Sequence, residues 1–378
     1  MGKKHINEIS FLRSIACLSI VLLHSIAWGM EYVGFLLNLP ELSKTILDSI
    51  NVLLYYGTPT FIFITAFILG YSYKDKMTLS KGFLSKRLQF ILIPYICMAF
   101  LYASPYALLS FEQFSLKVLL NIFIGDFHAY FVLIIFQFYL LFVFLKKWLD
   151  QTHPSKVILY SFLINSAYLV IFNFTKPVDI VFSDYVWERF YWIPFPGWIF
   201  YFSIAYYIGR NYESFIQSIY KYKVIVLIAP FVTGLALLYF YHSGMITIHS
   251  SKRIDILFHT LSVIAFVIYF ARKMKSIPSL FLVINKYSYG IYLLHTSYIS
   301  ILIVLFTLLS LNMGIFTIIV LFVVSTACSI MTIYYVNHMR IGKYIVGKVD
   351  VKPKQIHQVD SNTVLANNQH STYNDKHI

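Results

Sequence analysis

The stretch FLRSIACLSIVLLHS at residues 11–25 carries one arginine and one histidine within an otherwise apolar sequence. The apolar run covers about residues 9–29, which matches the roughly 20 residues that a helix needs to cross the hydrocarbon core of a bilayer. It is too long for a cleavable signal peptide, contains Arg13 and His24, and lacks a small-x-small cleavage site. We therefore expect it to remain as a membrane-spanning helix.

Arg13 and His24 are predicted to share one face of this helix. Their separation of eleven residues, at about 100° each, gives three turns plus about 20° and an offset of roughly 16 Å along the axis. An ionisable side chain inside a membrane helix is costly, so each is interpreted as functional. The alternative is an arginine that extends to the headgroups and a histidine that is hydrogen-bonded within the core.

Similar apolar runs continue along the chain, and the composition agrees with them. Of the 378 residues, 59% are hydrophobic and 12% are charged, whereas a soluble domain carries roughly 25% charged residues. The runs lie at about 9–29, 52–72, 88–108, 128–145, 156–174, 192–209, 223–241, 255–271, 288–308 and 313–335. We expect an all-α, polytopic membrane bundle of about ten transmembrane helices at residues 1–345, followed by a polar, disordered cytoplasmic tail at 346–378.

Lysine and arginine are concentrated in alternate loops between the runs. They gather after the second, fourth, sixth and eighth runs and are sparse in the loops between these. Because cytoplasmic loops carry an excess of Lys and Arg, the alternation predicts that both termini are cytoplasmic. It also accounts for the net charge of +14 without a nucleic-acid partner. The three cysteines lie in apolar stretches without Cys/His spacing, which predicts neither a disulfide framework nor a metal site.

Other positions carry candidate chemistry, each with two interpretations. His295 ends the string YSYGIYLLH at 287–295 and is either catalytic or a hydrogen-bonded core residue. Lys86 and Arg87 stand before the third run and fit either cytoplasmic anchoring or a phosphate contact. The sequence GTP at 57–59 predicts unwound backbone beside a cavity. Polar residues near the fourth run, which either line a cavity or pair locally, are Asp126, His128 and Gln137.

Over about residues 5–340, these segments resemble the membrane-bound acyltransferase 3 family. The motifs concerned are Arg13-x10-His24, GTPTFIFITAFILGY at 57–71, the basic residues before Pro94-Tyr95, and YSYGIYLLH. Within the family the chain resembles the branch of the poly-N-acetylglucosamine intercellular-adhesion protein C, through GTP-x-FI, Lys86-Arg87 followed by ILIPY, and GWIFYF at 197–202. It departs from many members at Thr65-Ala66, where they have Ser-Gly, and at Ile91, where they have a second arginine.

The resemblance implies an acyltransferase in the bacterial plasma membrane, with the lipid bilayer and polysaccharide-synthesis proteins as partners. An acyl group, usually acetyl, would pass from acyl-CoA to a hydroxyl of a cell-surface or exported carbohydrate. Arg13, with Lys86 or Arg87, would hold the CoA phosphates. His24 would take the proton from the hydroxyl, and His295 would position the acceptor or stabilise the oxyanion. Neither a metal nor a permanently bound cofactor is expected.

Two other functions fit the same sequence. Aromatic-rich helices and broken segments also suit an exporter of a nascent exopolysaccharide such as poly-beta-1,6-N-acetylglucosamine, a role assigned to members of the branch that the chain resembles. A proton-coupled transporter of a small solute would use His24 and His295 as a relay. This last function is ranked below the others, because Asp and Glu are nearly absent from the apolar runs.

Overall fold

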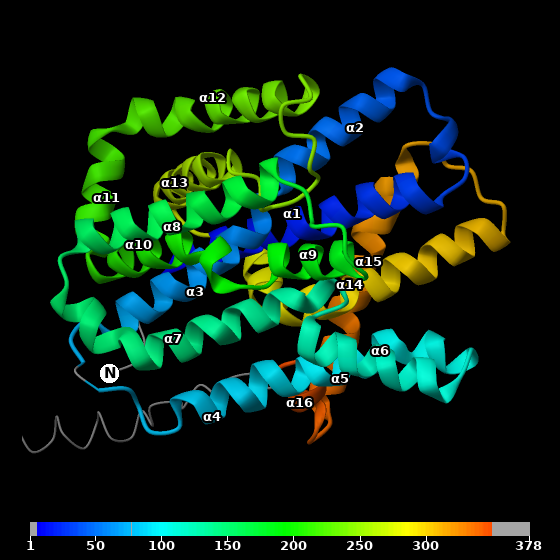
Figure 1. Cartoon of the computed structure of the whole chain (residues 1–378), viewed down its shortest axis with the longest axis horizontal. Coiled ribbons are helices and arrows are strands. Elements are labelled where there is room, and N and C mark those ends of the chain that lie inside the picture. Colours follow the sequence, from blue (N-terminus) through cyan, green and yellow to red (C-terminus); the bar gives the residue numbers. More distant parts are fainter. Residues whose placement is uncertain (1–5, 77, 350–378) are drawn as a thin grey trace, which may run out of the picture.

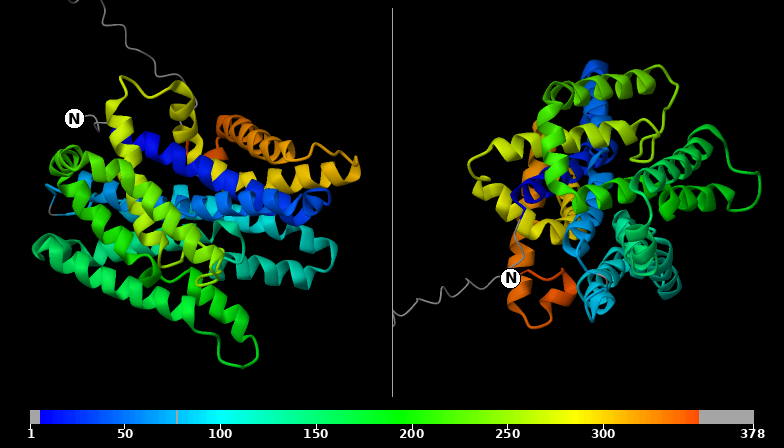
Figure 2. Two further views of the ribbon diagram at one scale, coloured as in Figure 1. Left: turned by 90° about the horizontal axis from the view of Figure 1, so that it is seen from above. Right: turned by 90° about the vertical axis from the view of Figure 1, so that its left-hand side faces the viewer.

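The apolar runs form long helices, many of which extend in a similar direction across the molecule (Figures 1 and 2). The computed structural model describes residues 6–76 and 78–349. Its helices are α1 Asn7–Tyr32, α2 Glu41–Leu54, α3 Gly57–Tyr73, α4 Phe83–Arg87, α5 Ile93–Ala103, α6 Phe111–Ile124, α7 Phe131–Gln151, α8 Pro154–Phe174, α9 Ser183–Trp192, α10 Ile199–Arg210, α11 Tyr212–Lys221, α12 Lys223–His242, α13 Ile256–Lys273, α14 Ser279–Leu308, α15 Phe316–His338 and α16 Gly342–Ile345. The described residues contain no β-strand, so the predicted all-α class is confirmed.

Nine helical stretches within these described residues are long and apolar enough to cross a membrane. The remaining predicted run, 192–209, contains α10, which has only 12 residues and contacts α3 and α8. Eight of these residues are buried, so α10 is a short helix inside the bundle. The prediction of a multi-pass membrane bundle is therefore confirmed, with one of the ten runs too short to be a candidate span.

Helix α1 lies near the centre of the bundle, in contact with α3, α13, α14 and α15. Small side chains on its α14 face allow a close approach between these two helices. Ser14 Oγ donates a hydrogen bond to Phe281 O at 2.5 Å, and Cys17 Sγ lies 3.7 Å from Ser288 O. The pairing of α1 with α14 brings the Arg13-x10-His24 motif beside the segment that ends at His295.

Two departures from regular α-helix adjoin the site. The chain turns at residues 55–56 between α2 and α3. The prediction of unwound backbone at residues 57–59 is wrong, because these residues form the first turn of α3, although Thr58 does line a cavity. Residues Leu88–Leu92 form a short π-helix between α4 and α5. π-Helical turns inside α-helices are rare and occur frequently at functional sites.

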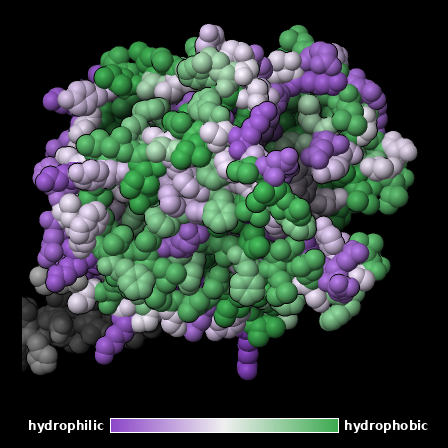
Figure 3. All heavy atoms as spheres, viewed as in Figure 1, coloured by the Kyte–Doolittle hydropathy of each residue, from purple (hydrophilic) through white to green (hydrophobic). Residues whose placement is uncertain are grey.

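The cationic parts of the chain at the loop after α3, at the junction of α7 with α8, and around α11 lie at the same end of the molecule, on the left in Figure 1. On the face shown in Figure 3, hydrophilic side chains gather along this left-hand edge, and apolar side chains cover much of the remainder. This arrangement agrees with the alternation of charge, while the cytoplasmic placement of the termini stays a prediction. Of the predicted tail, residues 346–349 are described, and 350–378 lie outside the described residues.

Candidate functional site

Arg13 and His24 line two different cavities along α1. The helix is unbroken between the two positions, so their offset is roughly 16 Å along its axis. Arg13 lines a cavity of about 260 Å³, here called the inner cavity. His24 lines a second cavity of about 370 Å³, here called the outer cavity. One helix therefore carries one ionisable side chain into each of two neighbouring spaces.

Two aromatic side chains stand between the cavities. Phe131, at the start of α7, and Tyr292, on α14, line both of them. Their ring centroids are 6.0 Å apart, and both side chains are buried. A substrate arm that runs past this pair of rings would connect a group bound beside Arg13 with a group bound beside His24.

His24 and His295 form a hydrogen-bonded pair. His24 Nδ1 lies 2.9 Å from His295 Nε2, and His295 Nδ1 lies 2.9 Å from the carbonyl oxygen of Ile291. Because the carbonyl can only accept, the proton of a neutral His295 is on Nδ1, and its Nε2 accepts the hydrogen bond from His24 Nδ1–H. A neutral His24 then carries its free lone pair on Nε2. The pair thus fixes the tautomer that a general base requires.

A third histidine packs against this pair. The ring of His128 is centred 5.3 Å from His295 and 6.4 Å from His24. Its Nε2 lies 3.0 Å from Tyr292 O, and its Nδ1 lies 3.0 Å from the hydroxyl of Thr296. Despite this proximity, no group of three or more His, Cys, Asp and Glu side chains in the described residues is arranged to hold a metal ion.

Aromatic rings and a carboxylate with two cationic partners, Asp126, characterise the outer cavity. Its aromatic lining, apart from histidines, is Trp28, Tyr55, Phe127, Tyr130, Phe131, Trp192 and Tyr292. Tyr130 and Trp192 stack with their centroids 5.4 Å apart. Asp126 accepts from Arg189 at 2.5 Å and from Lys117 at 2.6 Å. Flat rings beside charged hydrogen-bonding groups suit a ligand with apolar faces and hydroxyl edges, because the rings cover the faces and the polar groups bind the edges.

Gln137, in contrast, pairs within the fold. Its Nε2 donates to Ile193 O at 3.1 Å, and its Oε1 accepts from Phe195 N at 3.0 Å. These bonds fix the connection between α9 and α10. Of the three polar residues near α7 that had two interpretations, Asp126 and His128 line the outer cavity, and Gln137 makes local pairs.

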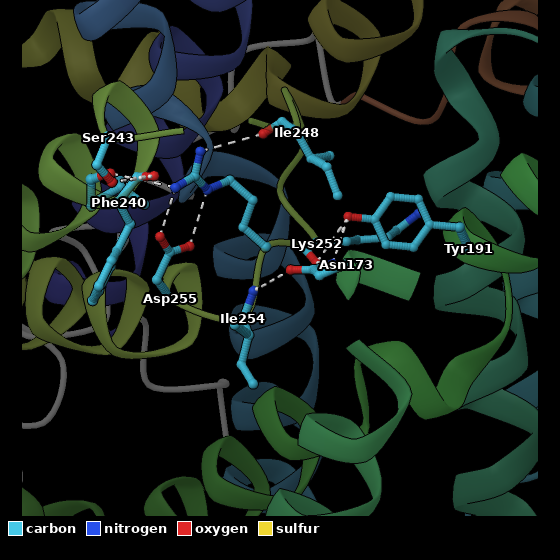
Figure 4. A network of polar contacts seen from close by, with 10 residues as sticks. Asn173, Tyr191, Phe240, Ser243, Ile248, Lys252, Ile254 and Asp255 are labelled. Carbon is cyan, nitrogen blue, oxygen red and sulfur yellow. Dashed lines mark hydrogen bonds and ion pairs between the residues drawn. The ribbon is translucent and has the colours of Figure 1, made fainter. Parts of the chain in front are cut away.

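The loop at residues 243–255 forms one wall of the outer cavity and is held by a polar network (Figure 4). Arg253, which is fully buried, donates to both carboxylate oxygens of Asp255 at 3.1 and 2.7 Å. On the other side of the loop, Tyr191 Oη donates to Lys252 O at 3.0 Å. The residues that this loop contributes to the cavity are His249, Ser250 and Ser251. Their positions are thus fixed by contacts outside the cavity.

Lys252, in the same loop, has a buried amine that lacks polar contacts among the described residues. Its side chain is 1% exposed, and Nζ has no hydrogen-bond partner in the part of the chain that the structure describes. Four rings surround Nζ at 5.0–5.5 Å from their centroids, namely Tyr130, Tyr191, Trp192 and Trp198. Burial, followed by the positive charge of Arg189, holds the pKa of Lys252 well below its usual value.

This lowered pKa predicts how the stability contribution of Lys252 changes with pH. Between the lowered pKa and the unfolded value near 10.4, the unfolded chain binds one proton more than the folded chain, so stability rises with pH. We therefore compare the melting temperatures of wild type and Lys252→Met. The difference, wild type minus variant, should become more positive from pH 7 to pH 9. The contribution of Lys252 to the free energy of unfolding changes by at most about 1.4 kcal/mol per pH unit. Thermal unfolding in detergent, followed by tryptophan fluorescence, measures the difference.

The matched control for this experiment is Lys223→Met. Lys223 is exposed at the start of α12. Its replacement should shift the melting temperature equally at each pH. A difference for Lys252→Met that stays constant between pH 7 and pH 9 would show that the buried amine keeps its ordinary pKa.

The inner cavity has a mainly apolar lining and two cationic residues. In the described part of the chain, the charged residues among those lining it are Arg13 and Lys348. Arg13 Nη1 lies 3.5 Å from Asn285 Oδ1 on α14, and Tyr139 of α7 also lines the cavity. A cationic space with a mainly apolar lining suits an anionic group that carries a neutral arm.

The predicted phosphate-binding residues Lys86 and Arg87 differ in their surroundings. The guanidinium carbon of Arg87 lies 4.1 Å from the ring centroid of Phe83 and 5.3 Å from that of Tyr139. Since Tyr139 lines the inner cavity, Arg87 is one side chain removed from it. Lys86 is exposed and is not among the described residues that line this cavity. The structure thus brings Arg87 closer to the inner cavity than Lys86.

Comparison with known proteins identifies the family. The family model described as an acyltransferase domain, acyltransferase 3, matches residues 6–334. The chain belongs to the acyltransferase 3 family. It is 36% identical over 355 residues to a Bacillus subtilis (strain 168) protein named as membrane-bound acyltransferase YfiQ, covering 93% of this chain and 96% of that protein. No solved structure matches the chain.

Two further relatives of this acyltransferase 3 protein are named as poly-beta-1,6-N-acetyl-D-glucosamine export proteins. The chain is 29% identical over 229 residues to the one from Staphylococcus aureus (strain MSSA476), covering 60% of this chain and 63% of that protein. It is 25% identical over 233 residues to the one from Staphylococcus epidermidis, covering 60% and 62%. Both the predicted family and the predicted relation to the intercellular-adhesion branch are confirmed.

Several lining residues of this acyltransferase 3 chain were missed by sequence reasoning. Tyr139 and Lys348 line the inner cavity, and Arg189 lines the outer one. Each reaches its cavity through tertiary packing, and no local pattern distinguished it. One signal was available on α14, where Tyr292, His295 and Thr296 follow the i, i+3, i+4 spacing of a single helix face. The two departures from the family pattern, Thr65 and Ile91, both line the inner cavity.

Proposed function

We propose that this membrane protein transfers an acyl group, acetyl in the simplest case, from acyl-CoA to a hydroxyl of a carbohydrate. One observation carries the proposal: Arg13 and His24 share α1, and each lines one of two cavities that meet at Phe131 and Tyr292. This arrangement suits a donor held at one end and an acceptor held at the other. The bacterial plasma membrane, with the Arg13 end facing the cytoplasm, is the matching location.

The donor occupies the inner cavity in this proposal. Arg13 stays positively charged and binds a phosphate through its planar fork, with Arg87 or Lys86 as a further phosphate contact near the opening. The pantetheine arm follows α1 past Phe131 and Tyr292. The axial offset between Arg13 and His24, roughly 16 Å, is the distance that this arm spans.

The chemical step takes place beside His24. Its Nε2 accepts the proton of the acceptor hydroxyl while that oxygen attacks the thioester carbonyl. The new C–O bond forms, the C–S bond breaks, and the CoA thiolate takes the proton back from His24. His295 acts here as a positioning residue: its Nε2, 2.9 Å from His24 Nδ1, holds the reactive tautomer and stabilises the imidazolium that forms transiently.

The carbohydrate occupies the outer cavity. The stacked pair Tyr130 and Trp192 offers ring surface to the apolar face of a sugar, and Asp126 and Arg189 offer hydrogen bonds to its hydroxyls. The relatives named as exporters of poly-beta-1,6-N-acetyl-D-glucosamine support a carbohydrate acceptor of this class. Proteins of polysaccharide synthesis would then deliver the acceptor to this side.

A second function, export of the nascent polysaccharide, is favoured by the names of those same relatives. Deletion of the protein in its native cell distinguishes the two. For an acyltransferase, we expect the polymer to be secreted in ordinary amount with its ester groups lost. Linkage analysis and ester quantification of surface glycans measure both quantities. Polymer retained inside the cell would instead favour the exporter.

A further inference from the structure

After α15 the chain returns to the inner cavity, which Lys348 lines. Helix α16, Gly342–Ile345, is followed by residues 346–349, and this stretch, residues 342–349, is called the C-terminal segment below. A single side chain of α15 fixes its end. Asn337 Nδ2 donates to Gly347 O at 3.1 Å, and Asn337 Oδ1 accepts from Val349 N at 3.1 Å. The backbone on both sides of Lys348 is therefore held.

Gly347 lets the C-terminal segment lie directly on the cavity wall. Its φ of +86° is one that glycine adopts readily. A Cβ at this position would lie 2.5 Å from the ring of Tyr289, which lines the inner cavity. Tyr289 in turn donates from its hydroxyl to Ile91 O at 2.6 Å, inside the π-helix. The segment, the cavity wall and the π-helix thus form one continuous contact.

The C-terminal segment also packs against Phe90, another lining residue of the inner cavity. The rings of Tyr344 and Phe90 are stacked, with centroids 5.8 Å apart and an interplanar angle of 10°. Lys348 Nζ lies 5.6 Å from the centroid of Phe90. The ring of Phe90 therefore positions both the segment and its cation at the edge of the cavity.

Lys348 carries a charge at this edge without an ion-pair partner among the described residues. The side chain is exposed and lines the inner cavity, and none of the ion pairs among the described residues includes it. The other charged lining residue, Arg13, is also cationic. An anion that enters this cavity meets Lys348 without competition from a carboxylate in the described lining.

We propose that the C-terminal segment completes the donor site and that Lys348 binds the phosphates of acyl-CoA at its opening. This inference rests on the proposed function and adds a binding residue to it. An ammonium group at a solvent-exposed edge is a flexible point charge that binds phosphate oxygens. Arg13 then binds the part of the donor that lies deeper in the cavity.

Replacing Lys348 with alanine should weaken CoA binding by about 5- to 10-fold, as expected for one charge-assisted contact that is partly exposed to water. Titration calorimetry with CoA and full-length protein in nanodiscs measures the dissociation constant. The matched control is Lys343→Ala on the same segment, where Nζ lies 5.0 Å from the ring of Tyr344. Lys343 is not among the described lining residues, so its loss should leave binding unchanged.

A comparison of donors separates CoA phosphate from lipid phosphate. Acetyl-pantetheine lacks the phosphates, so Lys348→Ala should raise the KM for acetyl-CoA and leave that for acetyl-pantetheine unchanged. An equal rise for both donors, which disappears in vesicles without anionic lipid, would assign Lys348 to lipid headgroups and overturn the proposal. Equal CoA affinity of wild type and variant also overturns it, while the proposed function stands. Absence of CoA binding to wild type overturns both.

Discussion

Replacing His24 with alanine is expected to reduce acyl transfer by about 10²–10⁴-fold, because the variant lacks the base that receives the hydroxyl proton. Replacing His295 should cost less. His24 would keep its own ring, but its Nδ1 would lose the acceptor that lies 2.9 Å away. The rates are measured in proteoliposomes as transfer of radiolabelled acetyl from acetyl-CoA to the carbohydrate acceptor.

The control for the His24 variant is His259→Ala. His259 is also buried in a membrane helix, where its Nε2 lies 3.3 Å from Leu53 O. It is not among the described residues that line the inner or outer cavity. If the rate of acyl transfer falls in this control, it should fall in proportion to the amount of folded protein. A folded His24→Ala protein that transfers acetyl at the wild-type rate would remove His24 from the mechanism.

Much of the fold was predictable because a membrane span is a local property of about 20 residues. The apolar runs and charged loops gave the spans and their order. Helix α10 shows the limit of this signal. Its run includes Pro194 and Pro196, and a proline removes a backbone donor and disfavours helix before it, so α10 begins only at Ile199. A hydropathy average over about 20 residues is hardly changed by two prolines. The backbone hydrogen bonds of a helix, in contrast, are interrupted at each of them.

The site was predictable only where its residues share one helix. Arg13 and His24 could be related by counting turns along α1, and their axial offset follows from helix geometry. The hydrogen bond between His24 and His295 joins residues separated by 271 positions. Lys348 likewise reaches the inner cavity only because the chain folds back after α15. Contacts of this kind depend on how helices pack, which no local pattern encodes.

A large effect on stability is expected at Gly70 and Gly209, where α3 crosses α10. A Cβ on Gly70 would lie 2.1 Å from Tyr206 O, and one on Gly209 would lie 2.3 Å from Phe67 O. Both obstacles are backbone atoms, so an added methyl group must separate the two helices. Gly70→Ala and Gly209→Ala should each cost about 2–3 kcal/mol, which lowers the melting temperature by roughly 5 °C or more.

Gly34→Ala is the control, because its Cβ would meet no atom of the described residues within 4 Å. Its melting temperature, measured in the same detergent, should match that of wild type. The crossing also affects the site, since Thr58 and Thr65 of α3 line the outer and inner cavities. Gly70→Ala should therefore reduce acyl transfer together with stability. A stable, fully active Gly70→Ala protein would show that α3 and α10 do not approach this closely, and that the short helix does not hold the cavity walls in place.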